Sequence, residues 1–539
     1  DDKTGTVTLS GNGELTVNAT YKPWGNYRHS VKKVVIGEGI TAIGRNAFDD
    51  VPYLTEVVLP ESVTAIGRSA FVHCNQLASI DISRVEKLED YAFSGCWALT
   101  VADIGSLTAL GEYAFERTGL RSVTIPESIT VIPRRAFSSC SRLEKVVLHD
   151  GITSIGYEAF DNCGRLTSLC LPKALKELED YAFSDCLCLT DIQLNEGLER
   201  IGRGALRGCE VLKELVIPDS VIEIRDYAFK GCTSLRAIHF GKKLSDVNYS
   251  AFQECPNLTT FTINKNNPNW EVHNQGLYNK KTRELEVVAP GYEGAYVVAE
   301  GTLTIGRDAF RKRKITSVSL PDSVKVVEDY AFADCESLKT VDLGEGVEKI
   351  GLRSFTCSGI TEITIPASVK KMGGDAFSRC TSLTKIVFQG LPPEVGDTFP
   401  EKGEVYVYYP GYMPEWKNAD VNGLGYYFDY IPDCQGRHDL RWEVIKAPTC
   451  QKAGWRSETW CAVCRQTVDP EGAIPVVDHS YGGWTTVTAP TTEKEGLSKR
   501  TCRNCGATEQ KVLPKQNASA QQPTQPTTPP ETEPTQPTQ

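Results

Sequence analysis

An alanine–phenylalanine pair recurs along this chain at a nearly constant spacing. The phenylalanine, or its one substitute Leu206, occupies fourteen positions that lie 22 or 23 residues apart, except for a single gap of 58 residues. A fixed period of roughly 20–30 residues with apolar columns is typical of a stacked-repeat fold. The spacing therefore predicts a solenoid. The remaining positions are Phe48, Phe71, Phe93, Phe115, Phe137, Phe160, Phe183, Phe229, Phe252, Phe310, Phe332, Phe355 and Phe377.

One repeat, residues 54–76, shows how such a unit folds. Val57 and Leu59 alternate with outward-facing residues, which predicts a half-buried strand. Pro60 cannot donate to a strand ladder, so it ends the strand and turns the chain. A second, shorter apolar stretch follows, and then the turn that buries Phe71. One unit cannot cover its own apolar residues, so neighbouring units must stack through parallel strand pairing.

The pattern I-G-x-x-A-F-x-x-C-x-x-L-x-x-V-x-L-P resembles the BspA-like leucine-rich repeats of bacterial surface proteins, and it covers residues 31–390. The resemblance implies a mainly β fold, a leucine-rich-repeat solenoid of about fourteen repeats with parallel strands. It also implies a secreted, cell-surface or wall-associated scaffold that binds protein or glycan partners and is not an enzyme. Members of the family are linked to adhesion to host proteins or to other cells.

Both ends of the repeat series carry segments that we expect to act as caps. In residues 1–30, two alternating runs flank Gly11-Asn12-Gly13, which predicts a hairpin that covers the first turn, with Trp24 packed on it. Residues 391–433 are rich in Tyr and Trp and resemble the aromatic terminal cap of the same family. Their aromatic rings favour the core of a cap, with sugar stacking as the alternative.

The gap of 58 residues predicts a hairpin inserted into one repeat at 264–300. Asn267-Pro268-Asn269-Trp270 and Leu277-Tyr278 resemble the insert that the family often carries. A structural elaboration is the simpler interpretation. Because insertions into solenoids often lie on one binding face, recognition is the alternative.

Two tandem Cys/His-containing β modules follow at 434–515, since His438 and His479, and also Cys461 and Cys502, are 41 residues apart. Cys461-x-x-Cys464 and Cys502-x-x-Cys505 have the spacing of structural zinc ligands. The two pairs are farther apart than in a usual zinc ribbon. Zinc, disulfides and reduced cysteines therefore all remain open, and no other cofactor is required. Residues 516–539 are rich in Pro, Thr and Gln, which predicts a disordered linker.

The other cysteines are mostly a feature of the repeat. Of the nineteen cysteines, ten stand three residues after the phenylalanine position. Stacked side chains of this kind point in parallel, which does not suit a disulfide. We therefore expect small, buried, apolar thiols. These are Cys74, Cys96, Cys140, Cys163, Cys186, Cys209, Cys232, Cys255, Cys335 and Cys380.

Several functions are disfavoured by the sequence. The net charge of −11 argues against nucleic acid, whose phosphates need clustered Lys and Arg. No apolar stretch is long enough to span a membrane. Seven histidines, five of them scattered, form no hydrolase, metalloprotease or phosphate-binding motif, so catalysis is not expected.

Recognition is expected on the outward positions of the strands, on the concave face of the solenoid. The candidates are Asp81, Asp103, Gln193, His239 and Asp342. We expect a monomer that binds a host or microbial protein, or a glycan, through this face. The alternatives are an architectural spacer that presents another module and a non-catalytic accessory region of a larger surface protein.

Overall fold

The computed structural model describes residues 1, 3–17, 24–395, 405–409, 483–502 and 506–515, and it gives only the backbone of 406–409 and of short strands between 428 and 474. The chain forms two units, Asp1–Asp429 and Tyr430–Gln539. Among the described residues, the helical segments are two 3-10 turns, η1 (Gly25–Tyr27) and η2 (Tyr249–Phe252). No helix in these ranges has the length and apolar character to cross a bilayer.

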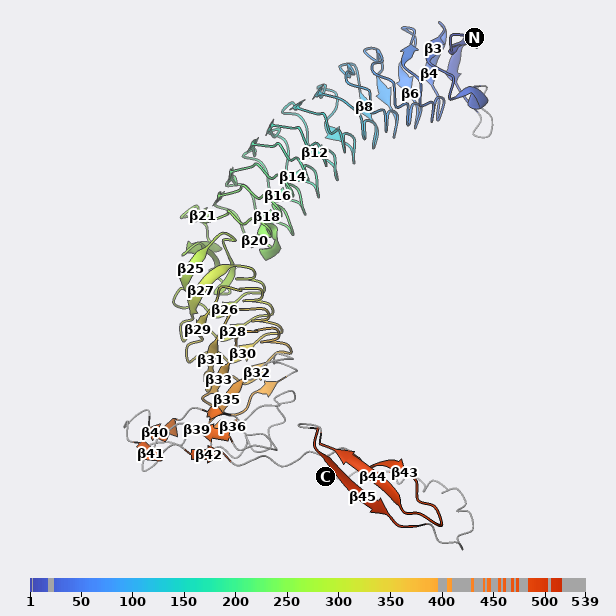
Figure 1. The fold of residues 1–539 in the computed structure, drawn as a ribbon. Coiled ribbons are helices and arrows are strands. Elements are labelled where there is room, and N and C mark those ends of the chain that lie inside the picture. Colours follow the sequence, from blue (N-terminus) through green and yellow to red (C-terminus); the bar gives the residue numbers. More distant parts are fainter. Residues whose placement is uncertain are drawn as a thin grey trace, which may run out of the picture. The chain divides into compact units, whose positions relative to one another are not determined.

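The first unit is a stack of turns, and most turns contribute one long and one short strand (Figure 1). In the turns that hold Phe93 and Phe115, an isolated bridge between Ser79 and Val101 takes the place of the long strand. The long strands are β1 (Thr6–Leu9), β3 (Lys33–Ile36), β5 (Glu56–Val58), β9 (Ser122–Thr124), β11 (Lys145–Val147), β13 (Ser168–Cys170), β15 (Asp191–Gln193), β17 (Glu214–Val216), β19 (Ala237–Phe240), β21 (Thr260–Ile263), β25 (Glu293–Val297), β27 (Lys314–Ser319), β29 (Thr340–Asp342), β31 (Glu362–Ile365), β33 (Lys385–Phe388) and β35 (Tyr406–Tyr409), with β36 (Phe428–Tyr430) following in the last sheet.

The short strands form a second column alongside. They are β2 (Gly13–Leu15), β4 (Ile40–Ile43), β6 (Ala65–Ile66), β7 (Lys87–Leu88), β8 (Ala109–Leu110), β10 (Val131–Ile132), β12 (Ser154–Ile155), β14 (Glu177–Leu178), β16 (Arg200–Ile201), β18 (Glu223–Ile224), β20 (Asp246–Val247), β24 (Glu284–Val288), β26 (Thr304–Ile305), β28 (Val326–Val327), β30 (Lys349–Ile350), β32 (Lys371–Met372) and β34 (Glu394–Val395).

Strands of successive turns pair in parallel, and the register sets equivalent residues opposite each other. Val34 is opposite Val57 in the long strands, and Ile201 is opposite Ile224 in the short strands. Because side chains alternate across a strand, this register keeps each apolar column on the inside. The predicted parallel solenoid is confirmed.

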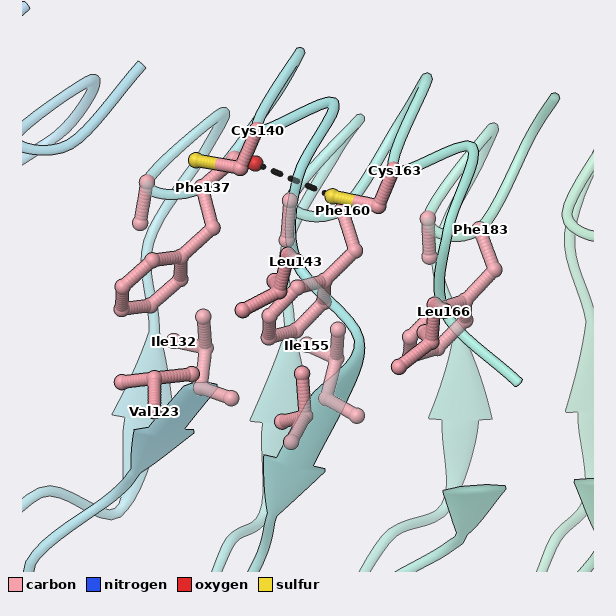
Figure 2. Packing of buried hydrophobic residues seen from close by; sticks show 14 of the residues in the cluster. Val123, Ile132, Phe137, Cys140, Leu143, Ile155, Phe160, Cys163, Leu166 and Phe183 are labelled. Carbon is pink, nitrogen blue, oxygen red and sulfur yellow. Dashed lines mark hydrogen bonds between the residues drawn. The ribbon is translucent and has the colours of Figure 1, made fainter. Parts of the chain in front are cut away.

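The phenylalanine rings form the spine of the core (Figure 2). All the rings at the repeat position are fully buried, and neighbouring rings stack with centroids 4.8–5.9 Å apart. Trp24 extends the stack at its start, 5.0 Å from Phe48, as the sequence predicts. Leu206 is equally buried but separates Phe183 from Phe229.

The thiol column runs beside the rings. Each buried thiol at the repeat position donates a hydrogen bond to the carbonyl of the phenylalanine position one turn earlier, at 2.9–3.5 Å; Cys163 to Phe137 is one example (Figure 2). Burial raises the pKa of the Cys96 thiol to about 12. The prediction of buried thiols is confirmed, and each sulfur also joins two turns.

Two left-handed residues frame each phenylalanine of the column except Phe252, which has only Glu254, and the sequence analysis did not foresee them. Around Phe93 these are Tyr91 (φ 58°) and Gly95 (φ 77°). The N–H groups of all three residues donate to carbonyls of the next turn at 2.8 Å. Left-handed conformation is costly for side chains larger than glycine. Here a continuous third ladder of backbone hydrogen bonds between turns offsets that cost.

The N-terminal hairpin prediction is wrong in its pairing. Strands β1 and β2 do not pair with each other; β1 pairs in parallel with β3, and β2 with β4. Their alternating residues extend the two columns by one more turn that lacks a phenylalanine. The segment still covers the edge of the first complete turn, because joining the existing ladders satisfies more backbone groups than a separate hairpin would.

The predicted insert contains an antiparallel sheet. Strands β22 (Trp270–His273), β23 (Gly276–Asn279) and β24 pair in antiparallel order, and β24 then pairs in parallel with β26. The last inserted strand therefore rejoins the short-strand column. With β25, it makes another turn without a phenylalanine, so the solenoid is longer than the fourteen predicted repeats.

The first turn after the insertion carries an arginine in place of the cysteine. Arg313 is buried, and its Nε donates to the carbonyl oxygen of Val288 at 2.8 Å. The N–H of Val288 donates to the carbonyl of Ala309, so Val288 occupies the backbone place of a phenylalanine. Burial lowers the pKa of Arg313 to about 10. A guanidinium thus repeats the contact that thiols make elsewhere.

The second unit contains short antiparallel sheets. Its strands are β37 (Leu440–Arg441), β38 (Val444–Lys446), β39 (Gly454–Arg456), β40 (Thr459–Cys461), β41 (Thr467–Asp469), β42 (Gly472–Ile474), β43 (Thr485–Thr488), β44 (Gly496–Thr501) and β45 (Thr508–Leu513). The sheets have the orders β37-β40-β41, β38-β39-β42 and β43-β44-β45. Strand β43 begins 41 residues after β38, which agrees with two tandem modules. The linker 516–539 and most of the aromatic segment 391–433 lie outside the described residues.

One buried hydroxyl breaks the alanine column. Ser354 precedes Phe355, is fully buried, and its Oγ has no hydrogen-bond partner. Because burying an unsatisfied hydroxyl costs about 1–3 kcal/mol, we expect Ser354→Ala to raise the free energy of unfolding by about 1 kcal/mol or more. Urea unfolding of the variant checks this. Ser368→Ala, which removes a hydroxyl bonded to the carbonyl of Val347, is the control and is expected to destabilise.

Candidate functional site on the outward face of the long strands

The outward face of the long strands carries exposed valines. Four of them share one column of the sheet, as Val35 is opposite Val58, Thr124 opposite Val147, Val216 opposite His239 and Val297 opposite Ser319. The fifth, Val101, lies in the adjacent column opposite Ser79. The exposed fractions are 40% for Val58 and Val147, 66% for Val101, 63% for Val216 and 60% for Val297. We call this surface the valine face.

The predicted recognition residues lie on the same face but do not converge. Gln193, His239 and Asp342 stand on β15, β19 and β29, and Asp81 and Asp103 lie in the corresponding segments of two earlier turns. All are exposed except His239, which is partly buried. They are spread along the stack on separate turns. The structure therefore gives them a common face and no common pocket.

The polar atoms of these five side chains are largely engaged within the protein. Asp81 accepts hydrogen bonds from the hydroxyl and the N–H of Ser83, which lower the pKa of its carboxyl. Asp103 accepts from the N–H of Gly105. These contacts define the turn that follows the strand position. Both carboxylates thus have a structural role.

The other three side chains bond to the neighbouring turn. His239 lies between Thr262 and Glu214, at 2.6 and 2.9 Å. Asp342 accepts from the hydroxyl of Ser319 at 3.2 Å. The amide oxygen of Gln193 accepts from the thiol of Cys170 at 3.4 Å. These are ladder contacts along the sheet, so they fix the surface on which a partner would lie.

Two hollows interrupt the valine face. The first, of about 690 Å³, lies between residues 100–105 and 122–128 and contains Val101 and Asp103. The second, of about 280 Å³, crosses β25, β27 and β29 and is lined by Val297, Ser317 and Asp342 among others. Each hollow thus combines an exposed valine with one of the predicted carboxylates.

The largest hollow of those described lies beside the insertion and measures about 840 Å³. Glu271, His273 and Arg283 line it from the inserted strands, and residues 297–302 line it from the next turn. Val297 borders both this hollow and the smaller one on β25. The insertion therefore adds a hollow beside Val297 of the valine face, at the one interval that departs from the 22- or 23-residue spacing.

The turn of the insertion closes the gap between two long-strand sheets, a feature that the sequence analysis missed. One sheet ends at β21 and the next begins at β25. The amide oxygen of Gln275 accepts from the N–H of Phe261 on β21, at 2.8 Å, and the amide nitrogen of Asn274 donates to the carbonyl of Val297 on β25, at 2.9 Å. Both turn residues are left-handed. The Asn-Gln-Gly triplet was the available signal, since such triplets favour tight hairpin turns.

The zinc prediction falls mainly outside the described residues. Cys464 and Cys505 are not described, and Cys461 is described only as backbone at the end of β40. Cys502 is buried, and the N–H of Gly506, a left-handed residue, donates to its carbonyl at 3.0 Å. Within the ranges the structure describes, no His, Cys, Asp and Glu side chains cluster as metal ligands. Zinc at the four cysteines stays a prediction.

The stacked turns with parallel long and short strands define a leucine-rich-repeat solenoid. The family model for the BspA type leucine rich repeat region matches residues 26–144, 108–222, 201–273 and 303–398. These matches cover more than half of the sequence, and the chain belongs to this family.

Several solved structures of leucine-rich repeat proteins are similar to this chain. A leucine-rich repeat protein from Bacteroides ovatus is 25% identical over 74% of this chain and 92% of its own, with a TM-score of 0.45. A leucine rich cell surface protein from Faecalibacterium prausnitzii is 21% identical over 76% of this chain and 92% of its own, with a TM-score of 0.36. A leucine-rich repeat protein from Eubacterium ventriosum is 23% identical over 71% of this chain and 92% of its own, with a TM-score of 0.39. No curated protein matches significantly.

Proposed function

We propose that this protein is a bacterial cell-surface repeat protein whose valine face binds a protein partner. The observation that carries the proposal is the alignment of exposed valines on one sheet face, with hollows beside Val101 and Val297. Single exposed apolar residues are ordinary, but a series of them on one face favours a contact surface. Family membership supports a scaffold role and a monomeric, non-catalytic protein.

A glycan partner is favoured less than a protein. Neutral sugars are commonly held by an exposed aromatic ring face, and the described part of the valine face offers valine, threonine, serine and charged side chains instead. The exposed valines among these polar side chains instead give small apolar areas that another protein can cover. The insertion hollow adds charged side chains at its rim, of the kind that set specificity around an apolar contact.

The test uses Val216→Lys and Val297→Lys, singly and together, in the full chain. Candidate partners are enriched from microbial and host-cell surface extracts, and the affinity of one purified partner is then measured. We expect each variant to weaken binding about tenfold or more, since tenfold corresponds to about 1.4 kcal/mol. Val131→Lys is the matched control, because Val131 is 49% exposed on the short strand β10.

Equal binding by all variants contradicts the proposal and favours the spacer that presents another module. A partner lost through Val131→Lys, but not through the two valine-face changes, places the contact on the short strands instead. Circular dichroism of each variant excludes unfolding as the cause of lost binding.

A further inference from the structure

The insertion divides the solenoid core in two. The buried residues form one cluster from Trp24 to Ala289 and a second from Tyr278 to Val405. The short-strand sheet is interrupted here between β20 and β24, and the long-strand sheet between β21 and β25. The sheets also break at other turns, such as between β8 and β10, but the buried core is continuous there. We call the junction of β20 and η2 with β24 and β26 the seam. Turns elsewhere share continuous packing, so the seam is where the two halves can separate most easily.

A β-bulge in the insertion creates this division. In the antiparallel pair, Leu277 is opposite Val287 and Tyr278 is opposite Leu285, so Glu286 has no partner residue on β23. The extra residue reverses the faces: Leu277 and Val287 pack in the first core, and Tyr278 and Leu285 in the second. Glu286 therefore lies between Leu285, which packs in the second core, and Val287, which packs in the first, and Val288 packs in the second core again.

The carboxyl of Glu286 also contacts the opposite side of the seam. It accepts a hydrogen bond from the backbone N–H of Tyr249 on η2, and it faces Asp246 on β20 and Glu284 on its own strand. The hydroxyl of Tyr249 bonds to Asp308, which follows β26. Both carboxyl groups thus come from the side of β24 and β26, and both contact Tyr249 on the other side of the seam.

The charges around these carboxyls are unevenly balanced. Asp308 forms an ion pair with Arg311 at 3.2 Å, and the positive charge of Arg307 also lowers its pKa. The groups that act on Glu286 are the acids Glu284 and Asp246, and Glu284 in turn faces Glu328. The pKa of Glu286 is raised to about 7, mainly by burial and also by the two neighbouring acids. Burial and Glu328 raise the pKa of Glu284 as well.

We propose that the seam is a proton-operated hinge that is closed when Glu286 is protonated and loosened when it is ionised. A protonated carboxyl still accepts the hydrogen bond from Tyr249 through its carbonyl oxygen, and it places no negative charge beside Asp246 and Glu284. Ionisation adds a third negative charge at a partly buried junction, where water screens repulsion poorly. Opening the seam rehydrates all three acids and relieves that repulsion.

The direction of the pH dependence of closure follows from thermodynamic linkage. The folded pKa of Glu286 lies above its ordinary value of 4.5, so the closed seam binds the proton more tightly than the open one. Closure is therefore most favoured at acid pH and is lost as the pH rises through about 7. Between pH 5 and pH 8 the population of the open seam is expected to rise by at least about tenfold.

Hydrogen–deuterium exchange by mass spectrometry tests the hinge in the full chain, at pH 5 and pH 8, after correction for the intrinsic rates of exchange. In the wild type, the amides of β20, η2 and β24 should lose at least about tenfold in protection at pH 8. Glu286→Gln, which keeps the acceptor without the charge, should be equally protected at both pH values. Glu300→Gln, an exposed acid of the same segment, should behave as the wild type.

A second variant separates the hinge from general stability. Asp246→Asn removes one of the two acids that raise the pKa of Glu286, so this pKa should fall, and the loss of protection should become smaller and move to a lower pH. Two results overturn the proposal: pH dependence that persists in Glu286→Gln, or a change spread evenly over turns far from the seam. A wild-type seam that is equally protected at pH 5 and pH 8 overturns it as well.

Discussion

Phe160→Ala is expected to lower the free energy of unfolding by about 3–5 kcal/mol, the range measured when a fully buried aromatic ring is removed. The ring of Phe160 is completely buried and stacks on Phe137 at 5.3 Å and on Phe183 at 5.2 Å. Both contacts are lost in the alanine variant, and the backbone ladders on either side limit how far the cavity can collapse. Urea unfolding followed by circular dichroism measures the loss.

The effect should be local along the stack. Each turn contacts only its neighbours, so hydrogen exchange should increase in the turns that hold Phe137 and Phe183 and not beyond the insertion. Phe160→Leu is the matched control, because the chain itself places Leu206 in this column. We expect that change to cost less than about 1.5 kcal/mol. An equal loss in both variants would contradict this expectation and show that apolar volume alone cannot replace the aromatic ring in the column.

Asn267→Ala is expected to cost about 3–5 kcal/mol, concentrated at the start of the insertion. The side chain is 2% exposed. Its amide nitrogen donates to the carbonyls of Gly241 and Leu244, at 3.0 and 3.1 Å, and its amide oxygen accepts from the N–H groups of Asn269 and Trp270. Four hydrogen bonds of about 1 kcal/mol each are lost, and buried backbone groups are left without partners.

Asn266→Ala serves as the control for this prediction. Asn266 is the preceding residue, is exposed, and should tolerate the change within about 0.5 kcal/mol. Thermal unfolding and limited proteolysis of 264–300 compare the two variants. If Asn267→Ala melts like the wild type, the insertion is held by its apolar contacts with the two cores and not by this amide.

The repeat could be predicted from the sequence because its signal is summed over fourteen copies. Phe71, the cysteines three residues after the rings and the strand residues around Val57 each recur at a fixed spacing. Stacking alone then requires parallel pairing and a buried ring column. The position of the insertion could be predicted from the same regularity, since it lies in the one interval that is longer than 22 or 23 residues.

The features that appear once were harder to predict. The bulge at Glu286, the amides of Asn274 and Gln275 at the two sheet edges, and Arg313 in the thiol column depend on contacts between turns that no local pattern records. The N-terminal strands were misassigned for a related reason. A glycine-rich turn between two alternating runs also fits two successive strands of one solenoid turn, and only the neighbouring ladder decides between them.

The candidate recognition residues were predicted correctly in position, and their role in binding stays a prediction. Strand alternation places Gln193, His239 and Asp342 outward, yet their hydrogen bonds to adjacent turns make them part of the sheet. The exposure of Val101 and Val297 depends on how far neighbouring turns leave them uncovered, which spacing cannot reveal.

The buried thiols beside the phenylalanine rings determine how this protein responds to oxidation. Thiols react as thiolates, and those held deep between turns, such as Cys96 and Cys209, have pKa values of about 12. An intact molecule thus carries many cysteines that oxidants scarcely touch. Once a stretch of turns unravels, its cysteines become reactive together, and wrong crosslinks can then trap that stretch before it rewinds. Such crosslinks therefore mark molecules in which some turns have separated.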